Sequence, residues 1–351
     1  MSRRSCLILG ASGLVGQRLQ QRLVEHPMFK ISAIAGSPAT AGQNLQDLPW
    51  RLKEAKPDLP NLVVLDVNSD DFVEQCRQKN IEIAFSALPS EIALVIEKKL
   101  VDAGIVVFSN ASSYRRKTNV PMIIPEINPH HIHRSMHYCA TNCTLIPLAI
   151  PVSAIAKISP IHSVKMRSEQ ALSGAGWNLL YDAKALSGHV EPHIEGEAEK
   201  TAQELLHVLG EMNDQIISPA EFDLDVSCER ISRQDGHQVF VEVNTVKPLQ
   251  IEEIIDQFNQ IELSQELPSK PYNTIHCVER IDTTKHLWSD GEFFTNNPNP
   301  TNDLKAGMAI VVGGLKVEDS LVTFSAYSHN TIRGAAGGVV YLAEFVMNID
   351  S

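Results

Sequence analysis

The first thirty residues place a glycine-rich turn between a short apolar run and an amphipathic segment, and this arrangement constrains the fold most. Residues 5–10 (SCLILG) are apolar and end in glycine, as a buried strand and its turn would. The next segment, ASGLVGQRLQQRLVEHP, repeats apolar residues at helical spacing until Pro27. Glycines at such a turn let the backbone approach a pyrophosphate at the helix N-terminus. The spacing of Gly10, Gly13 and Gly16 therefore predicts a dinucleotide-binding turn, although a plain connecting turn would show the same local pattern.

The end of the second predicted strand bears on which dinucleotide would bind. The run ISAIA (31–35) is followed by Gly-Ser-Pro-Ala-Thr at 36–40, without Asp or Glu. An acid at this place usually binds the ribose hydroxyls of NAD. Its absence, with Ser37 and Thr40 as hydrogen-bond donors to a 2′-phosphate, favours NADP. No arginine is present there, so NAD stays open as the alternative.

Strand and helix patterns alternate through the first third of the chain. Residues 81–90 indicate a buried strand and a turn into a helix that ends near residue 103, and 105–108 indicate another strand. The polar, Pro- and Gly-containing segment 37–62 is expected to be loop. This alternation is typical of an α/β Rossmann-type domain with a doubly wound parallel sheet.

The pattern changes beyond about residue 160. Residues 161–168, 238–246 and 321–328 alternate as strands do, and 194–215 has a helical pattern. Long polar connections, including 282–303, separate these elements. We expect a second, α+β domain with a mixed sheet and helices on one face, because 351 residues exceed one small core.

Composition limits the partners. The net charge of −12 argues against nucleic acid, but a few placed cations can still bind an anionic substrate. No apolar stretch is long enough to span a bilayer, and the N-terminal apolar run is too short for a signal peptide. The six cysteines are scattered without a Cys-x-x-Cys pair, so we expect reduced thiols and a cytoplasmic protein.

One cysteine is a candidate nucleophile. Cys143 lies in ATNCTLIPLAI, immediately before an apolar run with helical character. A helix N-terminus lowers a thiol pKa, so this position predicts a reactive thiolate, whereas a buried structural cysteine is the plainer alternative. Pro147 fits early in a helix, but Pro151 does not, so we expect a short or kinked helix.

The histidines offer a base and a possible metal site. His237 follows the turn-forming pair Asp235-Gly236 and opens a predicted strand, so its imidazole can face a cleft. The cluster at positions 130, 131, 133 and 137 has no acidic or cysteine partner at a suitable spacing, and we expect no metal there. In RSEQALSGAGW, Gly174 can bring the backbone against a flat ring, or belong to an ordinary loop.

These motifs together resemble the aspartate-semialdehyde dehydrogenases, particularly the archaeal and fungal type. Matching segments are ASGLVGQRL, FSALPSEIA, VFSNASSYR, VPMIIPEIN, TNCT, QALSGAG, EGEAEK, DGH and SHNTIRGAAGG, in the order and spacing of that family. The resemblance covers nearly the whole chain. It implies a homodimer or homotetramer that uses NADP, a small-molecule substrate and inorganic phosphate.

The resemblance also implies the roles of single residues. Cys143 would be the nucleophile, His237 the general acid/base and Gln170 a residue that positions the substrate. The substrate-binding residues would be Arg115 and Lys200 for the phosphate, Glu197 and Arg230 for the amino and carboxylate ends, and Asn142. The cofactor would contact Gly10, Ser12, Gly13, Leu14, Val15, Ser37, Thr40, Ser86, Gly174 and Asn330.

On this resemblance we divide the chain into two domains. Residues 1–142 with the C-terminal helix 330–351 would bind NADP, and residues 143–329 would form the catalytic and dimerisation domain. The implied reaction is the reversible reductive dephosphorylation of L-aspartyl 4-phosphate to L-aspartate 4-semialdehyde through a Cys143 thioester, in the synthesis of lysine, threonine and methionine.

Some positions depart from the family pattern. Residues 229–233 read Glu-Arg-Ile-Ser-Arg where relatives commonly have Asn-Arg-Val-Pro-Val, and 167–169 read Arg-Ser-Glu where relatives have Thr-Thr-Met. Ala39 stands where relatives often carry arginine. We interpret these as changes in substrate and 2′-phosphate recognition that leave the Cys143–His237 pair intact.

Other functions fit parts of the same sequence. An acylating reductase of another short substrate, similar to malonyl-CoA reductase or N-acetylglutamyl-phosphate reductase, would use the same thiol chemistry. A non-catalytic dinucleotide-binding regulator would not need Cys143, His237, Gln170, Arg115 and Lys200 together. Nothing in the sequence favours a purely structural or interaction protein.

Overall fold

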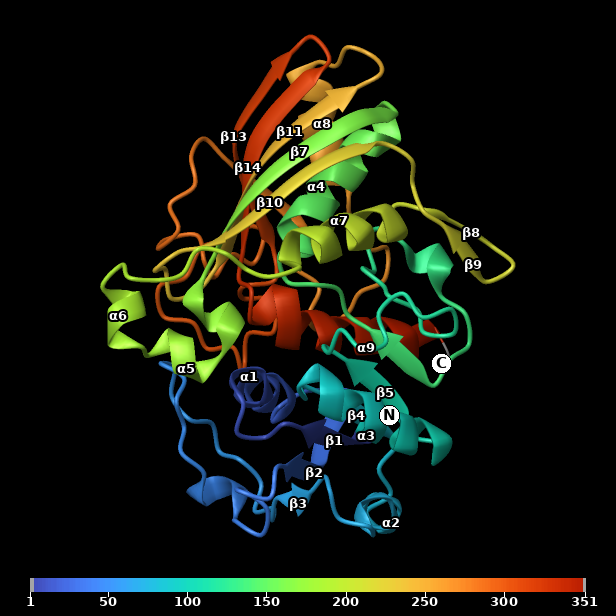
Figure 1. Ribbon diagram of the computed structural model, residues 1–351, viewed down its shortest axis with the longest axis vertical. Helices are drawn as coiled ribbons and strands as arrows, with labels where there is room; N and C mark the ends of the chain where they lie inside the picture. The colour runs from blue at the N-terminus through green and yellow to red at the C-terminus, as the bar shows by residue number, and fades with distance from the viewer. Residues whose placement is uncertain (1–2, 350–351) are drawn as a thin grey trace.

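The first sheet is built as the alternating pattern predicts. A computed structural model describes residues 3–349 (Figure 1). Six strands pair in the order β3-β2-β1-β4-β5-β6, every pair parallel. They are β1 (Arg4–Leu9), β2 (Phe29–Gly36), β3 (Leu65–Asp66), β4 (Ile83–Ser86), β5 (Val106–Ser109) and β6 (His137–Cys139). This strand order is that of a dinucleotide-binding fold, and it confirms the Rossmann-type prediction.

Helices cover both faces of this sheet. On one face, α1 (Leu14–Leu23) packs beside α9 (Gly337–Ile349), the last helix of the described chain. On the other face lie α2 (Phe72–Gln78) and α3 (Ser90–Asp102). Figure 1 shows α9 running across the middle of the molecule, between the two large sheets. Residues from opposite ends of the chain thus share one core.

The second sheet is mixed and lies above the first in Figure 1. Its order is β10-β7-β11-β14-β13-β12, with parallel pairs at both edges and antiparallel pairs between them. Its strands are β7 (Ile161–Gln170), β10 (Asp223–Arg230), β11 (His237–Thr245), β12 (Ile275–Val278), β13 (Ile310–Glu318) and β14 (Leu321–Ser328).

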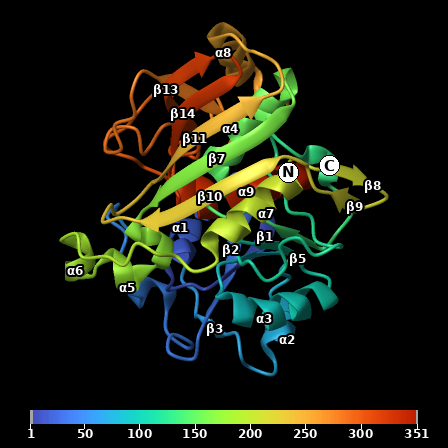
Figure 2. The ribbon, with the colours of Figure 1, turned by 45° about the horizontal axis from the view of Figure 1, so that its top comes forward.

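One face of this sheet is covered by helices. The helices α4 (Leu145–Ile158), α7 (Glu197–Val208) and α8 (Ile251–Gln260) share one apolar core with it. Figure 2 shows the strands of this sheet from a second side, with α4 and α8 behind them. On β11, Val239, Val241 and Val243 are buried in that core, whereas Phe240 and Glu242 alternate with them. Strict alternation of this kind leaves the second face of the sheet without a helical layer.

Smaller elements connect the layers. The short helices α5 and α6 lie beside α1 in Figure 1, and the β8–β9 hairpin projects on the far side. Their bounds are α5 (Trp177–Leu180), α6 (Ala183–Leu186), β8 (Glu211–Asn213) and β9 (Ile216–Ser218), with 3-10 turns at Leu45–Asp47, Pro129–His131 and Leu172–Ala175 and a π-helical turn at Ile332–Ala336. The predicted loops 37–62 and 282–303 contain no α-helix, and no helix in the range 3–349 has the length and apolarity to cross a membrane.

The helix expected over 194–215 was predicted too long, and the helix after Cys143, expected to be short or kinked, is not short. The helix expected over 194–215 is α7, which ends at Val208, because the backbone turns at Gly210 into the β8–β9 hairpin. A Cβ at Gly210 would lie 2.3 Å from the Ser218 carbonyl oxygen, so only glycine permits this approach. The helix after Cys143 runs on through Pro151 for 14 residues, because burial of nearly its whole surface offsets the lost hydrogen bond.

Candidate active site

Cys143 lies in the turn that joins β6 to α4. The side-chain oxygen of Asn142 accepts a hydrogen bond from the Thr144 N–H at 2.7 Å, and α4 begins at Leu145. From the other side the π-helical turn packs against the cysteine: a Cβ at Gly334 would lie 2.7 Å from the Cys143 Cβ. The half-buried residue Cys143 is therefore held between two helix starts.

The predicted lowering of the Cys143 pKa was wrong for the protein without substrate. Burial raises the pKa of the thiol to about 12, and the Glu197 carboxylate adds to this, while Arg115 opposes it. The cysteine precedes α4 by one residue, so the helix terminus contributes less than burial does. The candidate nucleophile is therefore a thiol in this state, and a reaction at its sulfur would need a group that accepts its proton.

His237 opens β11, as the sequence predicts, and its side chain is fully buried. Its Nδ1 lies 3.1 Å from the Ala171 N–H, and its Nε2 has no hydrogen-bond partner within residues 3–349. Burial lowers the pKa of His237 to about 3, helped by Arg233 and Arg230, whereas a backbone hydrogen bond at Gly236 opposes the shift. The ring is thus neutral, with one nitrogen left for a ligand.

The turn before His237 is fixed from both sides. Gly236 has φ +87°, a conformation that favours glycine, and a Cβ there would collide with the Tyr327 ring. Its N–H donates to the Asn330 side-chain oxygen at 2.8 Å, and its carbonyl accepts from Arg233 Nε at 2.9 Å. Asn330, predicted as a cofactor contact, therefore also anchors the histidine turn.

The Glu197 carboxylate joins the thiol segment to the histidine segment. Glu197 is the first residue of α7, and it accepts hydrogen bonds from Asn142 Nδ2 at 2.9 Å and Gln170 Nε2 at 3.3 Å. Asn142 precedes the nucleophile, and Gln170 precedes Ala171, whose N–H reaches His237. Segments about 30 to 100 residues apart are thus brought into one site.

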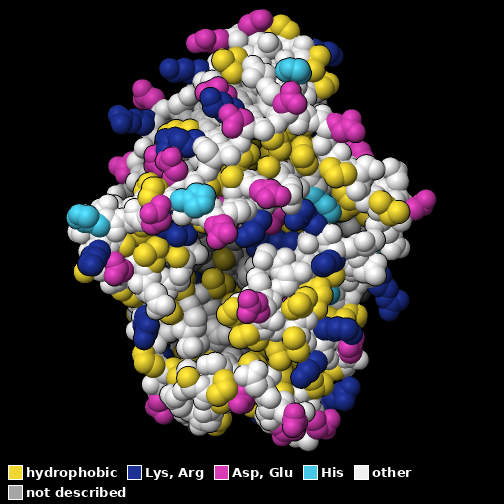
Figure 3. All heavy atoms as spheres, viewed as in Figure 1, with side chains coloured by type: hydrophobic (Ala, Val, Ile, Leu, Met, Phe, Trp, Pro, Cys, Tyr) yellow, Lys and Arg dark blue, Asp and Glu magenta, His cyan; other side chains and the backbone are white. Residues whose placement is uncertain are grey.

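The predicted cationic residues differ in how they are bound. Arg115 donates to the Ala140 carbonyl at 2.9 Å, the Asn110 carbonyl at 2.8 Å and Glu204 at 3.0 Å. Arg230 and the exposed Lys200 have no ion-pair or side-chain hydrogen-bond partner in the described chain, and the Arg230 Nε is buried. Figure 3 shows Lys and Arg side chains gathered at mid-height, beside a hollow where the two halves of the molecule meet. Such unpaired cations suit an anionic ligand.

The glycine-rich turn has the geometry of a nucleotide site. Gly10 has φ +88°, and a Cβ there would lie 2.7 Å from the Ala87 carbonyl oxygen. A Cβ at Gly16 would lie 2.0 Å from the Gly10 carbonyl oxygen. The N-cap residue Gly13 provides no side-chain cap, so the first N–H groups of α1, at Leu14 and Val15, are left for a ligand.

The remaining predicted cofactor residues surround the same edge of the sheet. Ser86 ends β4, and its buried hydroxyl has no partner among the described residues. Ser37 is exposed after β2, and Thr40 donates to its carbonyl at 3.2 Å. A Cβ at Gly174 would lie 3.3 Å from the His237 Nε2, which places this glycine between the two parts of the site. An orphaned hydroxyl and crowded glycines fit a bound dinucleotide.

Three contributors were not predicted from the sequence. Gly334 packs on the nucleophile, Glu204 accepts hydrogen bonds from Arg115 and from the Asn142 N–H at 2.6 Å, and Trp177 Nε1 donates to the Ser12 carbonyl at 2.9 Å. The small residues of TIRGAAGG signal a close approach, but they do not say to which segment. Trp177 and Glu204 left no such signal.

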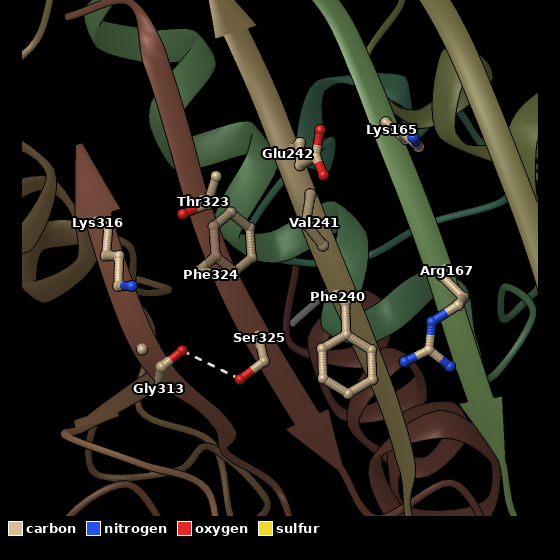
Figure 4. Close-up of a pocket in the computed structure, with 11 residues that line it drawn as sticks. Lys165, Arg167, Phe240, Val241, Glu242, Gly313, Lys316, Thr323, Phe324 and Ser325 are labelled. Atoms are coloured by element: carbon tan, nitrogen blue, oxygen red, sulfur yellow. Dashed lines mark hydrogen bonds between the residues drawn. The ribbon is translucent and has the colours of Figure 1, made fainter. Parts of the chain in front are cut away.

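The departures at 167 and 169 lie away from the thiol. On β7, Gln170 and Ser168 are buried toward the helices, whereas Arg167 and Glu169 alternate onto the opposite face. Arg167 pairs with Glu169 at 3.1 Å and lies 4.4 Å above the Phe240 ring, as Figure 4 shows for the arginine and the ring. The interpretation of these two residues as substrate contacts was therefore wrong. Arg233 supports the histidine turn instead.

The clustered histidines are structural or face a different cavity. His137 Nε2 contacts Glu97 at 3.0 Å, and His131 contacts Asn128 at 3.0 Å and the Gly210 carbonyl at 2.9 Å. Over residues 3–349 no group of three or more histidine, cysteine or acidic side chains is arranged to hold a metal ion. All six cysteines are free thiols.

Comparisons with known proteins agree with this geometry. The family described as "Semialdehyde dehydrogenase, NAD binding domain" matches residues 5–135. Aspartate-semialdehyde dehydrogenase of Archaeoglobus fulgidus is 32% identical, covering 98% of each chain. A crystal structure of aspartate semialdehyde dehydrogenase with NADP from Candida albicans has a TM-score of 0.78 and 26% identity, covering 99% of each chain. A malonyl CoA reductase (NADP) of Metallosphaera sedula is 28% identical over 97% of this chain and 96% of its own length.

Proposed function

Because the chain belongs to the aspartate-semialdehyde dehydrogenase family, we propose that it converts L-aspartyl 4-phosphate and NADPH reversibly to L-aspartate 4-semialdehyde, NADP and phosphate. This step belongs to amino-acid biosynthesis toward lysine, threonine and methionine. The observation that carries the proposal is the Glu197 carboxylate, which joins the cysteine segment to the histidine segment through Asn142 and Gln170.

In the oxidative direction the Cys143 sulfur adds to the aldehyde carbon as its S–H proton leaves to His237, and the proton passes to the carbonyl oxygen, so that a thiohemiacetal forms. NADP, when bound, accepts the hydride from that carbon. His237 takes the hydroxyl proton as the carbonyl of the thioester forms. A phosphate oxygen then attacks the acyl carbon, the C–S bond breaks and the cysteine is released as the acyl phosphate forms.

The protonation states support this division of labour. A thiol with a pKa near 12 must lose its proton during attack, and a histidine with a pKa near 3 is neutral before the reaction. In the structure the Ala171 N–H donates to Nδ1, which favours the ring hydrogen on Nε2. Accepting a proton at Nε2 therefore requires the other tautomer, with the ring hydrogen on Nδ1.

We propose that the substrate is held by charges on both sides of the thiol. Arg115 and Lys200 would bind the phosphate, and Arg230 the α-carboxylate, while Glu197 would bind the amino group and Gln170 the reacting acyl group. The unpaired state of Arg230 and Lys200 supports this assignment, because an unpartnered cation in a concave site favours an anionic ligand. Arg115 would bind the phosphate while it stays paired with Glu204.

NADP is proposed to bind along the crowded turn after β1. Gly10, Gly13 and the start of α1 fit the pyrophosphate, and the unpartnered Ser86 hydroxyl offers a further hydrogen bond. No carboxylate follows β2 at 36–40, and Ser37 is exposed there, which supports a 2′-phosphate.

An acylating reductase that uses a CoA thioester is the second candidate, because a malonyl CoA reductase matches nearly the whole chain. The two activities differ in the acyl leaving group, phosphate or a thiol. The cations Arg115 and Lys200 favour the phosphate-dependent reaction. A non-catalytic regulator would have no need to retain both of them.

The decisive test is the reduction of NADP by L-aspartate semialdehyde with and without inorganic phosphate, using the native protein and Cys143→Ser. We expect turnover that requires phosphate and falls by about 1,000-fold or more in the variant. Turnover with malonyl-CoA and NADPH but not with the semialdehyde would overturn the substrate assignment. Equal turnover by Cys143→Ser would overturn the thioester mechanism.

We further propose a homodimer or homotetramer assembled through the open face of the second sheet. Figure 4 shows Phe240, Thr323 and Ser325 on neighbouring strands that line a cavity of about 460 Å³ on this face. An uncovered, partly apolar sheet face supports self-association.

Residues 1–142 with 330–351 are proposed as the NADP domain and 143–329 as the catalytic domain; of these, 1–2 and 350–351 lie outside the described residues. The six free thiols support a cytoplasmic location.

A further inference from the structure

A second basic cavity lies beside the site, between residues 116–121, the segment at 131–133, the end of α7 and the β8–β9 hairpin. Its volume is about 150 Å³, enough for a small ion with water. The hairpin contributes apolar and amide side chains, and no Asp or Glu in the described chain lines the cavity. This is unusual in a protein with a net charge of −12.

The cations at the mouth of this cavity are not neutralised. Arg116 and Lys117 are exposed, and neither has an ion pair or a side-chain hydrogen bond within residues 3–349. Arg116 has φ +61°, which costs a non-glycine residue about 1 kcal/mol or more. That conformation lets two successive arginines diverge: Arg115 reaches Glu204, and Arg116 lines the cavity. Backbone strain of this kind recurs at ligand sites.

Inside the cavity the histidines offer donors. Both ring nitrogens of His133 are shielded from solvent and have no partner in the described chain, although an imidazole always carries at least one N–H. A buried donor without an acceptor is unfavourable by about 1–3 kcal/mol. Both ring nitrogens of His131 already have partners, Asn128 and the Gly210 carbonyl, so this ring lines the cavity without a free hydrogen-bonding group.

His207 completes the basic lining. Burial lowers its pKa to about 4, and the neighbouring His131 and Arg116 contribute. Glu211 is the carboxylate that acts on this group of rings, through His131, and it does not line the cavity. Arg116 and Lys117 thus line the space beside the neutral rings of His131 and His207, and no carboxylate of the described residues lines it with them.

We propose that this cavity is a second binding site for a small phosphate-type oxyanion, separate from the catalytic site. The ligand is either inorganic phosphate or the phosphomonoester group of a small metabolite, because Arg116 and Lys117 offer charge and donors and the ring of His133 offers a shielded N–H without a partner in the described chain. His207 lies on α7, one turn beyond Glu204, and Arg116 follows Arg115.

The test titrates inorganic phosphate into the full-length, NADP-loaded protein by calorimetry. We expect the native protein to bind two phosphates and Arg116→Gln/Lys117→Gln to bind one, with affinity at the lost site reduced about tenfold or more. His133→Leu, which removes only the ring donors, should weaken the same site. Lys98→Gln/Lys99→Gln on α3 removes equal charge elsewhere and should leave both sites unchanged.

A second readout separates this site from the catalytic one. The KM for phosphate in the oxidative reaction should change less than about twofold in Arg116→Gln/Lys117→Gln, because these residues do not line the thiol site. A native protein that binds one phosphate overturns the proposal, as does a variant that still binds two. A variant whose phosphate KM rises as steeply as its binding falls also overturns it, because one shared site would then explain both.

Parallel titration with methyl phosphate distinguishes the two sources of the ligand. Tighter binding of the ester than of inorganic phosphate at the second site identifies a phosphorylated metabolite as the ligand, and tighter binding of inorganic phosphate identifies the free ion. Both results support the site.

Discussion

The turn after β1 and the turn before α4 both lead a parallel strand into a helix N-terminus, but they are held in different ways. The first is shaped by close backbone approaches, of Gly16 to the Gly10 carbonyl and of Gly10 to the Ala87 carbonyl. The second is held by side chains from distant segments, with Glu197 and Glu204 bonded to Asn142 and Gly334 packed on Cys143. Close approaches between backbone segments shape the proposed nucleotide site. The proposed catalytic site depends instead on side chains that several segments hold in place.

The packing on the thiol gives the largest expected effect. Gly334→Ala would place a methyl group 2.7 Å from the Cys143 Cβ and must displace the nucleophile. We expect kcat/KM to fall about 100-fold or more while NADP affinity is kept, measured by steady-state kinetics and NADP titration.

The matched control is Gly16→Ala, whose methyl group would lie 2.0 Å from the Gly10 carbonyl oxygen. It should weaken NADP binding and leave thiol alkylation at its native rate. Thermal melting must show both variants folded. If both variants lose the same function, the two turns are not independent, and the comparison fails.

The pH dependence of thiol reactivity tests the second turn directly. Because burial raises the Cys143 pKa to about 12, the thiolate fraction increases about tenfold for each pH unit below that value. The rate of inactivation by iodoacetamide should therefore increase about 100-fold from pH 7 to pH 9, without a plateau. A plateau below pH 8 would show that the helix terminus controls the thiol after all.

Removing the Glu197 charge, which joins the cysteine segment to the histidine segment, should change thiol reactivity and catalytic turnover in opposite directions. Glu197→Gln keeps an acceptor for Asn142 but removes a carboxylate that raises the Cys143 pKa. We expect kcat/KM to fall about tenfold, while the alkylation rate increases about threefold. Glu199→Gln, on the same helix and bonded to Gln203, is the control and should change neither rate. Slower alkylation in Glu197→Gln would contradict this account.

The smallest effect is expected on the open face of the second sheet. Arg167→Ala removes an ion pair with Glu169 and a contact with Phe240, on the face opposite Gln170. Its kcat/KM should change less than about twofold, because exposed pairs contribute little. Arg233→Ala, which also releases the Gly236 carbonyl, should lose more. Sedimentation would show whether Arg167→Ala weakens self-association, and a large loss of kcat at an unchanged oligomeric state would contradict the placement.

Part of the site could be predicted from the sequence, because some signals are local. The glycine spacing and the alternation of strands and helices predicted the turn after β1 and the first sheet. The pair Asp235-Gly236 predicted the turn that positions His237. For Cys143 the local signal misled: its position before a helix predicted a lowered pKa, whereas burial, which depends on the whole fold, raises it.

What the sequence by itself determined is the fold class, the nucleotide turn and the residue types able to perform thioester chemistry. Only the tertiary structure decided which partners those residues have. In the folded chain Arg115 pairs with Glu204, Arg230 has no partner among the described residues, and Arg167 lies on the strand face opposite Gln170. The physical reason is range: backbone conformation follows from near neighbours, whereas burial, charge pairing and the face a strand residue occupies depend on segments far apart in the chain.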